Sequence, residues 1–154
     1  MRRMKLAAML LVLVCCGSGC VSGTAEWTQC VPYARQLSGI EIYGDAYTWW
    51  DRATPRYARG NTPGIGAVLV LSRTERLRYG HLAVVKRILG ARRIEVAHAN
   101  WGKDIFGRGY IHEAMLVEDA SPANDWSELR FWIQESGSFS SVFPARGFIY
   151  PLAS

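Results

Sequence analysis

The distribution of cysteine constrains the fold of this chain more than any other feature of its sequence. Its four cysteines, Cys15, Cys16, Cys20 and Cys30, all lie near the N-terminus of a chain of 154 residues. No disulfide can therefore cross-link the long segment that follows Cys30, and a hydrophobic core has to stabilise that segment. A chain of this length can bury such a core. Because no internal repeat or low-complexity linker divides it, we predict one domain over residues 26–154.

Residues 1–20 have the pattern of a secretory signal peptide. The chain begins Met-Arg-Arg-Met-Lys, continues with an apolar run from Leu6 to Val14, and then becomes rich in small residues. This order is typical of an export signal, and a buried N-terminal helix is the less typical alternative. The apolar run is also shorter than the roughly 20 residues that a membrane-spanning helix needs. We therefore predict export to the periplasm, the cell envelope or the medium, without a transmembrane segment.

The dipeptide Gly19-Cys20 allows a second interpretation of this segment. In a lipoprotein-type signal, Cys20 would become the acylated first residue, and the small Gly19 before it suits that role. Gly17, however, stands where such signals usually carry Leu or Val. A single acyl chain would hold the protein to a membrane only weakly. Acylation of Cys20 and plain cleavage nearby are both compatible with the sequence.

The positive charge of the chain is concentrated in the export segment. Its 18 Lys and Arg and 13 Asp and Glu give a formal net charge of +5. Cleavage after residue 19 would remove Arg2, Arg3 and Lys5 and leave 15 basic against 13 acidic residues, a net charge of +2. Nucleic-acid binding usually needs a strongly basic surface. A nucleic-acid partner is therefore disfavoured.

Helical patterns precede strand patterns along the rest of the chain. The first helix is predicted over residues 29–38, because Pro32 is tolerated in a first turn and Ser38-Gly39 is a typical stop. A second is predicted over residues 46–53, and residues 54–66 are rich in Pro and Gly, as in a loop. Short apolar or alternating runs predict strands at 67–71, 80–85, 93–100, 114–117, 129–133 and 147–150. This order predicts an α+β fold, in which N-terminal helices pack on an antiparallel five- to six-stranded sheet.

Cys30 is either a small buried hydrophobe, as free cysteines often are, or a nucleophile. It lies at the start of the first predicted helix, where free N–H groups and the helix dipole favour a thiolate. His81 follows Gly80 at the start of a strand and is a candidate general base.

An orienting group for His81 is expected on the next strand. Period-2 alternation places Val96, His98 and Asn100 on one face of residues 93–100. If residues 81–85 pair with this strand, either His98 or Asn100 could orient the His81 ring. The three histidines and Cys30 show no metal-ligand spacing, so we predict neither a metal ion nor a cofactor.

Four motifs in a fixed order resemble a known family. These motifs are Gln-Cys-x-x-Tyr from Gln29, Gly-Asp-Ala-x-x-Trp from Gly44, Gly-His-x-Ala-x-Val from Gly80, and a strand that ends at Asn100. Together they are similar to the CHAP family, the cysteine, histidine-dependent amidohydrolases/peptidases, over roughly residues 26–101. The resemblance implies a papain-like fold related to the NlpC/P60 hydrolases.

By the same resemblance, Cys30 would be the nucleophile and His81 the general base, and the family's third polar position would fall on His98, with Asn100 nearby. CHAP members often carry Glu where this chain has His98, whereas the NlpC/P60 group uses a histidine there. A neutral histidine can still accept the His81 N–H, but it supplies no fixed negative charge. The family's usual Gly-Asp before the first strand is Gly66-Ala67 here, which we interpret as a structural change.

Further residues are predicted to contact substrate. The backbone N–H of Cys30 is the first candidate donor to an oxyanion, and the Gln29 side chain is a candidate second donor. Tyr33 and Trp101 are candidates for the lining of a substrate groove. Trp49 and Trp50 are more typical of a core at their spacing.

The sequence thus predicts an exported, monomeric cysteine hydrolase that cleaves amide bonds of peptidoglycan or its stem peptides. It would be an N-acetylmuramoyl-L-alanine amidase or a stem-peptide or cross-bridge endopeptidase, and the motifs do not distinguish these bonds. One alternative is a non-catalytic cell-envelope binding domain, which the replacement of the usual Glu by His98 favours. Another alternative is an amidase for a small amide substrate.

Overall fold

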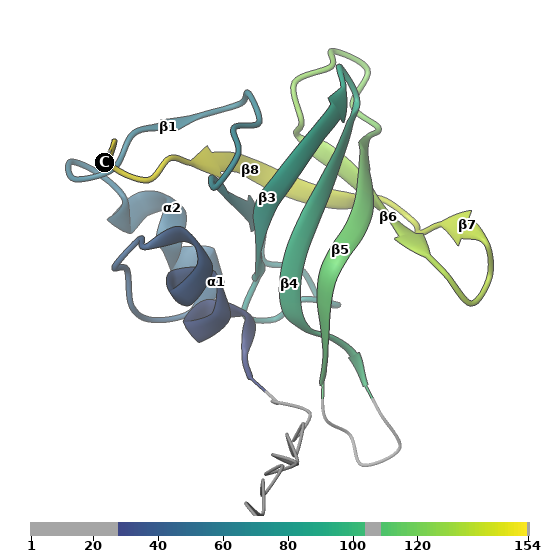
Figure 1. Cartoon of the computed structure of the whole chain (residues 1–154), viewed down its shortest axis with the longest axis horizontal. Helices are drawn as coiled ribbons and strands as arrows, with labels where there is room; N and C mark the ends of the chain where they lie inside the picture. The colour runs from purple at the N-terminus through teal and green to yellow at the C-terminus, as the bar shows by residue number, and fades with distance from the viewer. Residues whose placement is uncertain (1–27, 104–108, 154) are drawn as a thin grey trace, which may run out of the picture.

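The computed structural model describes residues 28–103 and 109–153 (Figure 1). The predicted signal segment and Cys20 lie outside these residues. None of the helices in the two described ranges is long and apolar enough to cross a membrane. The elements are α1 (Cys30–Ser38), a 3-10 turn η1 (Ala46–Thr48), α2 (Trp49–Arg52), β1 (Arg59–Gly60), β2 (Val68–Leu71), β3 (His81–Gly90), β4 (Arg93–Lys103), β5 (Gly109–Asp119), β6 (Glu128–Ile133), β7 (Ser138–Phe139) and β8 (Phe143–Ile149).

The helices agree with the sequence patterns. Gln29 is the extended N-cap of α1, and Pro32 falls in the first turn, where its missing N–H breaks no helical hydrogen bond. Gly39 ends α1 in the left-handed conformation, with φ of 69°, and its N–H donates to the Arg35 carbonyl. The predicted second helix, residues 46–53, is divided between η1 and α2.

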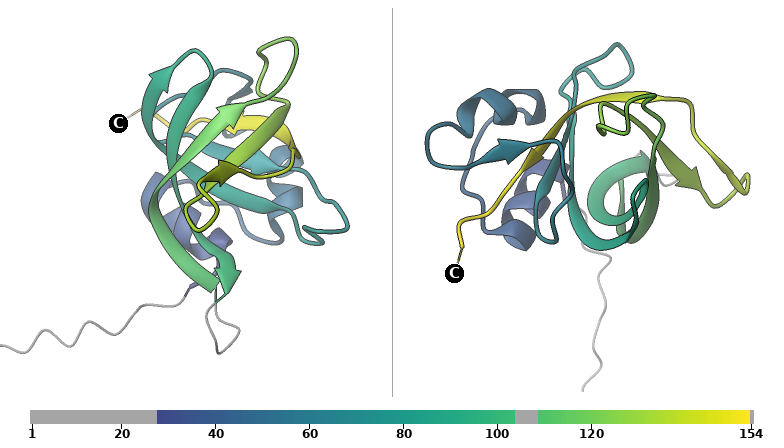
Figure 2. Two further views of the ribbon diagram at one scale, coloured as in Figure 1. Left: turned by 90° about the vertical axis from the view of Figure 1, so that its right-hand side faces the viewer. Right: turned by 90° about the horizontal axis from the view of Figure 1, so that it is seen from above.

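Six strands close into a ring. The order is β2, β3, β4, β5, β6 and β8, every neighbouring pair is antiparallel, and β8 returns to pair with β2. The α+β prediction is confirmed, with the addition that the pairing of β6 with β8 closes the sheet. Figure 2 shows the strands from above, where they curl around a common centre. The two-residue strands β1 and β7, which the sequence patterns missed, extend the sheet at β8 and β6.

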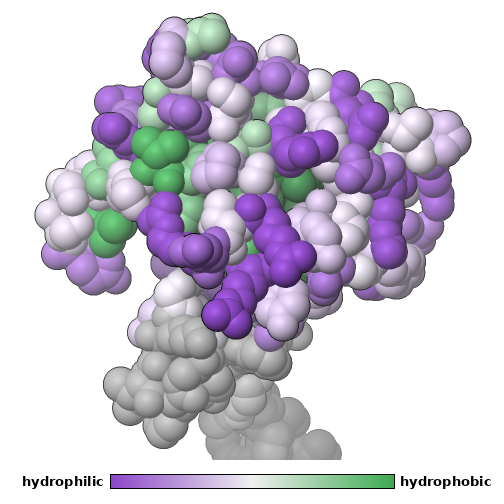
Figure 3. All heavy atoms as spheres, turned by 180° about the vertical axis from the view of Figure 1, so that it is seen from behind, coloured by the Kyte–Doolittle hydropathy of each residue, from purple (hydrophilic) through white to green (hydrophobic). Residues whose placement is uncertain are grey.

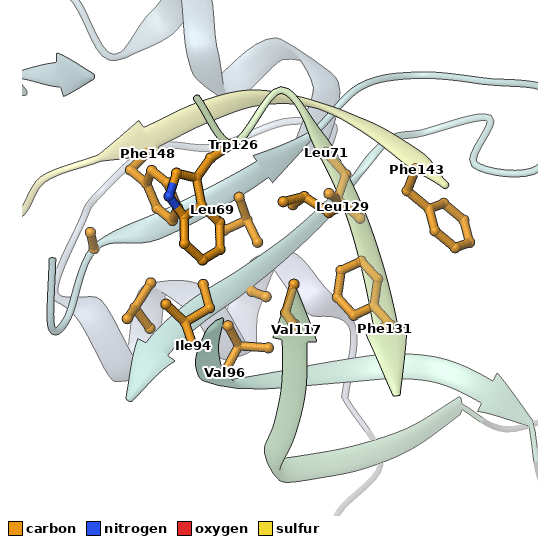
Figure 4. Packing of buried hydrophobic residues seen from close by; sticks show 13 residues of the cluster. Leu69, Leu71, Ile94, Val96, Val117, Trp126, Leu129, Phe131, Phe143 and Phe148 are labelled. Atoms are coloured by element: carbon orange, nitrogen blue, oxygen red, sulfur yellow. The ribbon is translucent and has the colours of Figure 1, made fainter. Parts of the chain in front are cut away.

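The strand β2 and the first half of β3, residues 81–85, are buried on both faces, which explains their continuous apolar sequences. Their residues alternate between two hydrophobic clusters. The interior cluster fills the ring (Figure 4) and consists of Ala67, Leu69, Leu71, Ala83, Val85, Ile94, Val96, Val117, Trp126, Leu129, Phe131, Phe143 and Phe148. The helix-side cluster lies between the ring and the helices and consists of Ala34, Ile40, Ile42, Ala46, Trp49, Ala53, Tyr57, Val68, Val70, Leu82, Val84 and Ile149.

The helices therefore cover one side of the ring, next to β3 (Figure 1). Trp49 is fully buried in the helix-side cluster and Trp50 packs against it, as expected for core residues. On the face opposite to the view of Figure 1, hydrophilic residues cover much of the surface, and hydrophobic residues show in separate groups (Figure 3).

The predicted alternation along β4 fails at Asn100. The partners of Ala99 and Trp101 on β5 are the adjacent residues Ile111 and Tyr110, so Asn100 is the extra residue of a β-bulge, with φ of 61°. Period-2 spacing predicted that Asn100 shares the face of Val96 and His98. This prediction is wrong, because the bulge turns Asn100 out of the alternation. Instead, the following residue, Trp101, packs against the interior cluster.

Candidate active site

A cavity of about 850 Å³ lies where the helices meet the end of the ring. It is lined by the start of α1, by residues 44–46, by the loop of residues 75–80, and by the ends of β3 and β4 that face this loop. Five predicted site residues line it: Gln29, Cys30, His81, Asn100 and Trp101. Segments far apart in the sequence therefore contribute the residues that the motifs predicted to act together.

Cys30 is the first residue of α1 and is half-buried. Burial raises the pKa of its thiol, while the backbone N–H groups of Leu82, Val31 and Cys30 itself favour the thiolate and act in the opposite direction. The contact with Leu82 places the sulfur against the first residues of β3, because Leu82 directly follows His81. The net effect is a thiol that is protonated in the resting protein.

Gly80 fixes the position of His81. Its φ is +69°, which favours glycine, and a Cβ built on it would lie 2.7 Å from the backbone nitrogen of Tyr47. The N–H of Tyr47 in turn donates to the Tyr79 carbonyl. The glycine therefore allows the η1 backbone to pack directly against the start of β3.

His81 and His98 form a buried pair. They are only 3% and 1% exposed, and the Nε2 atom of His81 lies 2.9 Å from the Nδ1 atom of His98. The second ring nitrogen of His98, Nε2, lies 3.2 Å from the sulfur of Met115 on β5. The His98 ring also stacks on Phe131 and lies beside Trp101 and His112. The pair thus occupies the aromatic end of the ring interior.

Burial controls the protonation of both rings. Burial, with a smaller contribution from the nearby His112, lowers the pKa of His81 to about 3. Burial, followed by His81 and His112, also places the pKa of His98 well below its ordinary value. Both imidazoles are therefore neutral at pH 7. With the Cys30 thiol also protonated, the site rests as a neutral thiol and neutral imidazoles, and not as a thiolate and an imidazolium.

Asn100 contacts Gln29 and not His81. Its Nδ2 atom donates to Oε1 of Gln29, with a separation of 2.6 Å. This contact joins the bulge on β4 to the N-cap of α1. The contact engages the oxygen of the Gln29 side-chain amide and leaves the two N–H groups of that amide available at the cavity.

The remaining predicted residues are placed as follows. Trp101 lines the cavity and also packs on His81, with ring centroids 4.9 Å apart. Tyr33 is half-buried one turn along α1, near Glu113, and is not among the described residues that line this cavity. His112 donates from Nε2 to the Trp101 carbonyl at 3.1 Å, because a carbonyl can only accept.

Sequence reasoning missed one wall of the cavity. Residues 75–79, Glu-Arg-Leu-Arg-Tyr, form a charged loop directly before Gly80, and Phe143 on β8 completes the wall. A charged run between two apolar strands, next to a candidate base, was the available signal. Phe143 had no local signal, because it reaches the cavity only through ring closure. Within the described residues, no group of three or more His, Cys, Asp or Glu side chains is arranged to hold a metal ion.

Comparison with known proteins agrees with the motifs. The CHAP domain family matches residues 20–100, just over half of the chain, and this segment includes Cys30, His81, His98 and Asn100. No curated protein matches the chain. CHAP domains are cysteine- and histidine-dependent amidases and peptidases that act on peptidoglycan and are typically associated with the cell wall. The chain belongs to the CHAP domain family.

Proposed function

We propose that this protein is an exported cysteine hydrolase that cleaves an amide bond of peptidoglycan, with Cys30 as nucleophile and His81 as general base. The observation that carries the proposal is the meeting of Cys30 and His81 in one cavity, with His98 within hydrogen-bond distance of Nε2 of His81. Nucleophile, base and orienting group then come from α1, β3 and β4. This is the arrangement that thiol-dependent acyl transfer requires.

The reaction begins from the neutral pair. Because His98 engages Nε2 of His81, only Nδ1 of His81 remains to accept the thiol proton. The sulfur attacks the substrate carbonyl as that proton moves to His81. The tetrahedral intermediate collapses when His81 returns the proton to the leaving amine, and a thioester on Cys30 remains. Water, deprotonated by His81, then attacks the thioester carbonyl. The carbon–sulfur bond breaks, the carboxylic acid is released, and the Cys30 thiolate takes back the proton from His81.

Two donors are available to the oxyanion. One is the backbone N–H of Cys30, since the first N–H groups of a helix have no helical partner. The other is the Gln29 side-chain amide, whose oxygen is already bound by Asn100. We therefore assign His98 to the orientation of His81 and Asn100 to the orientation of Gln29.

The cavity suits a substrate that carries both kinds of charge. Asp45 and Glu75 line it together with Arg76 and Arg78. Peptidoglycan stem peptides present amines and carboxylates, and both could be recognised here. Muramoyl-alanine amidase and endopeptidase activity both fit this wall. Four points stay predictions from the sequence. They are the export of the chain, its action as a monomer, a single domain over residues 26–154, and the choice between a lipid anchor at Cys20 and plain cleavage.

A second candidate function is a non-catalytic envelope-binding domain. It is favoured by the absence of a carboxylate at the His98 position and by the raised pKa of the Cys30 thiol. Such a domain would use the same cavity to hold peptidoglycan without cleaving it. An amidase for a small amide substrate would instead cleave free peptides and leave the polymer intact.

Digestion of purified peptidoglycan separates these functions. Wild type, Cys30→Ala and Gln36→Ala are incubated with the polymer, and released fragments are identified by mass spectrometry. Gln36 is exposed on the same helix and serves as the matched control. We expect identical fragments from wild type and Gln36→Ala and none from Cys30→Ala, and the new ends of the fragments identify the bond. Equal fragments from Cys30→Ala would exclude the cysteine mechanism, and binding without fragments from wild type would favour the second candidate.

A further inference from the structure

We propose that Met115 is a positioning residue that determines which ring nitrogen of His98 carries hydrogen, and thereby keeps His81 able to accept the thiol proton. This inference rests on the proposed function for its catalytic consequence. The state of the His98 ring itself does not depend on that function.

The first step concerns the contact between Met115 and His98. The Met115 sulfur lies 3.2 Å from Nε2 of His98. A thioether has lone pairs and no hydrogen to donate, so this contact is favourable only when Nε2 of His98 carries the hydrogen. A neutral imidazole has one N–H. With Nε2 protonated, Nδ1 of His98 is a bare acceptor.

The second step transmits this state to His81. One hydrogen must lie between Nε2 of His81 and Nδ1 of His98, which are 2.9 Å apart. Because Nδ1 of His98 is bare, Nε2 of His81 donates, and Nδ1 of a neutral His81 is free to accept a proton. The opposite tautomer of His98 would place the only hydrogen of His81 on Nδ1 and block it.

The same state is required after proton transfer. Once His81 has taken the thiol proton, both of its nitrogens carry hydrogen. Nδ1 of His98 must then still accept, since an N–H there would face the N–H of His81. One tautomer of His98 therefore serves both states of the base, and Met115 favours that tautomer throughout the reaction.

The surroundings make a weak acceptor sufficient. His98 is 1% exposed, so bulk water has almost no access to the ring. Phe131 stacks on its face, and Nε2 of the neighbouring His112 is already bound to the Trp101 carbonyl. No stronger acceptor than the sulfur contacts Nε2 of His98 among the described residues. A neutral ring needs only a small preference to select one of its two tautomers.

The position of Met115 results from an irregularity in the sheet. Val96 pairs with Met115 and His98 pairs with His112, so two residues on β5, Glu113 and Ala114, lie opposite Ala97 alone. This second bulge shifts Met115 toward the His98 ring. The sequence spacing of the two strands does not reveal that contact.

The test reads the ring hydrogens directly. Nitrogen-15 NMR of the histidine rings, without substrate, is compared for wild type, Met115→Leu and Met115→Gln. Leu keeps an apolar side chain of similar volume without an acceptor, and Gln offers a carbonyl oxygen. We expect wild-type His98 to carry hydrogen on Nε2, the Leu variant to show a mixture of tautomers, and the Gln variant to restore the wild-type state.

Hydrolysis of peptidoglycan is measured on the same three proteins. We expect kcat to fall about threefold to tenfold in Met115→Leu with KM unchanged, and to recover to within about twofold in Met115→Gln. Wild-type His98 with hydrogen on Nδ1, or a Leu variant with unchanged tautomer and kcat, would overturn the proposal. If the Leu variant does not fold, the wild-type spectrum alone decides. Failure of the cysteine mechanism would appear separately, as hydrolysis by Cys30→Ala.

Discussion

The two sides of the candidate site differ in how much water reaches them. Cys30 comes from the helix layer, is half-buried and lines an open cavity. His81 and His98 come from the ring and lie almost fully buried at its aromatic end. The proposed nucleophile is thus accessible to a large substrate, while the proposed base is almost fully buried and neutral. In the proposed mechanism, this difference requires that the proton moves from Cys30 to His81 during attack, because no charge is stored in a resting ion pair.

Among these predictions, replacement of His98 by Leu, on the buried side of the site, should cause the largest loss of activity. The change removes the Nδ1 acceptor and leaves Nε2 of His81 without a partner in the interior. We expect kcat to fall by about 10²–10³-fold, because His81, the proposed base, loses its orientation and its tautomer. Steady-state hydrolysis of peptidoglycan fragments measures this loss. His112→Phe is the control, since the His112 ring packs on His98 but is hydrogen-bonded to the Trp101 carbonyl and not to His81. A similar loss in this variant would contradict a specific role for His98.

Substitutions of Asn100 test the solvent-accessible side of the site in the same way. Asn100→Gly fits the φ of 61° but removes the donor to Gln29, and should lower kcat about tenfold. Asn100→Asp should be worse, about 100-fold, because a carboxylate attracts the Gln29 N–H groups and turns its oxygen toward the oxyanion. Kinetics of both variants on one substrate provide the comparison. A smaller loss in the Asp variant than in the Gly variant would contradict the assignment.

Gly80 lies where the helix layer meets the ring, and its substitution should lower the free energy of unfolding. Gly80→Ala combines a strained φ of +69° with a Cβ only 2.7 Å from the Tyr47 nitrogen, and should cost about 2–3 kcal/mol of unfolding free energy. Gly137→Ala has a similar φ of +61° with nothing within 4 Å, and should cost only about 1 kcal/mol. Urea unfolding of both variants measures the difference. Equal losses would mean that η1 is not held tightly against β3.

The pH dependence should show the smallest change. Because burial lowers the pKa of His81 to about 3, this ring stays neutral from pH 7 to pH 5. We expect kcat/KM to change less than about twofold over this range, whereas a base of ordinary pKa, near 6.5, would lose more than about tenfold. The same shift predicts a free energy of unfolding that falls as the pH drops below about 6.5, because the unfolded histidine binds the proton more tightly.

The sequence predicted what is determined locally. The start of α1 at Cys30, its end at Gly39, and the strand that begins at His81 follow from caps, proline and apolar runs. The contact of His98, and not Asn100, with His81 did not follow, because the bulge at Asn100 depends on how β4 pairs with a distant strand. Ring closure between β6 and β8 and the approach of Met115 to His98 depend on the same long-range pairing.

Trapping of the covalent intermediate tests the central claim most directly. Wild type and Cys30→Ala are mixed with a soluble peptidoglycan fragment, quenched in acid within the first turnover, and analysed by intact-protein and peptide mass spectrometry. We predict a mass increase equal to the acyl part of the substrate, located on Cys30, in wild type alone. Product release by Cys30→Ala at the wild-type rate would contradict the mechanism.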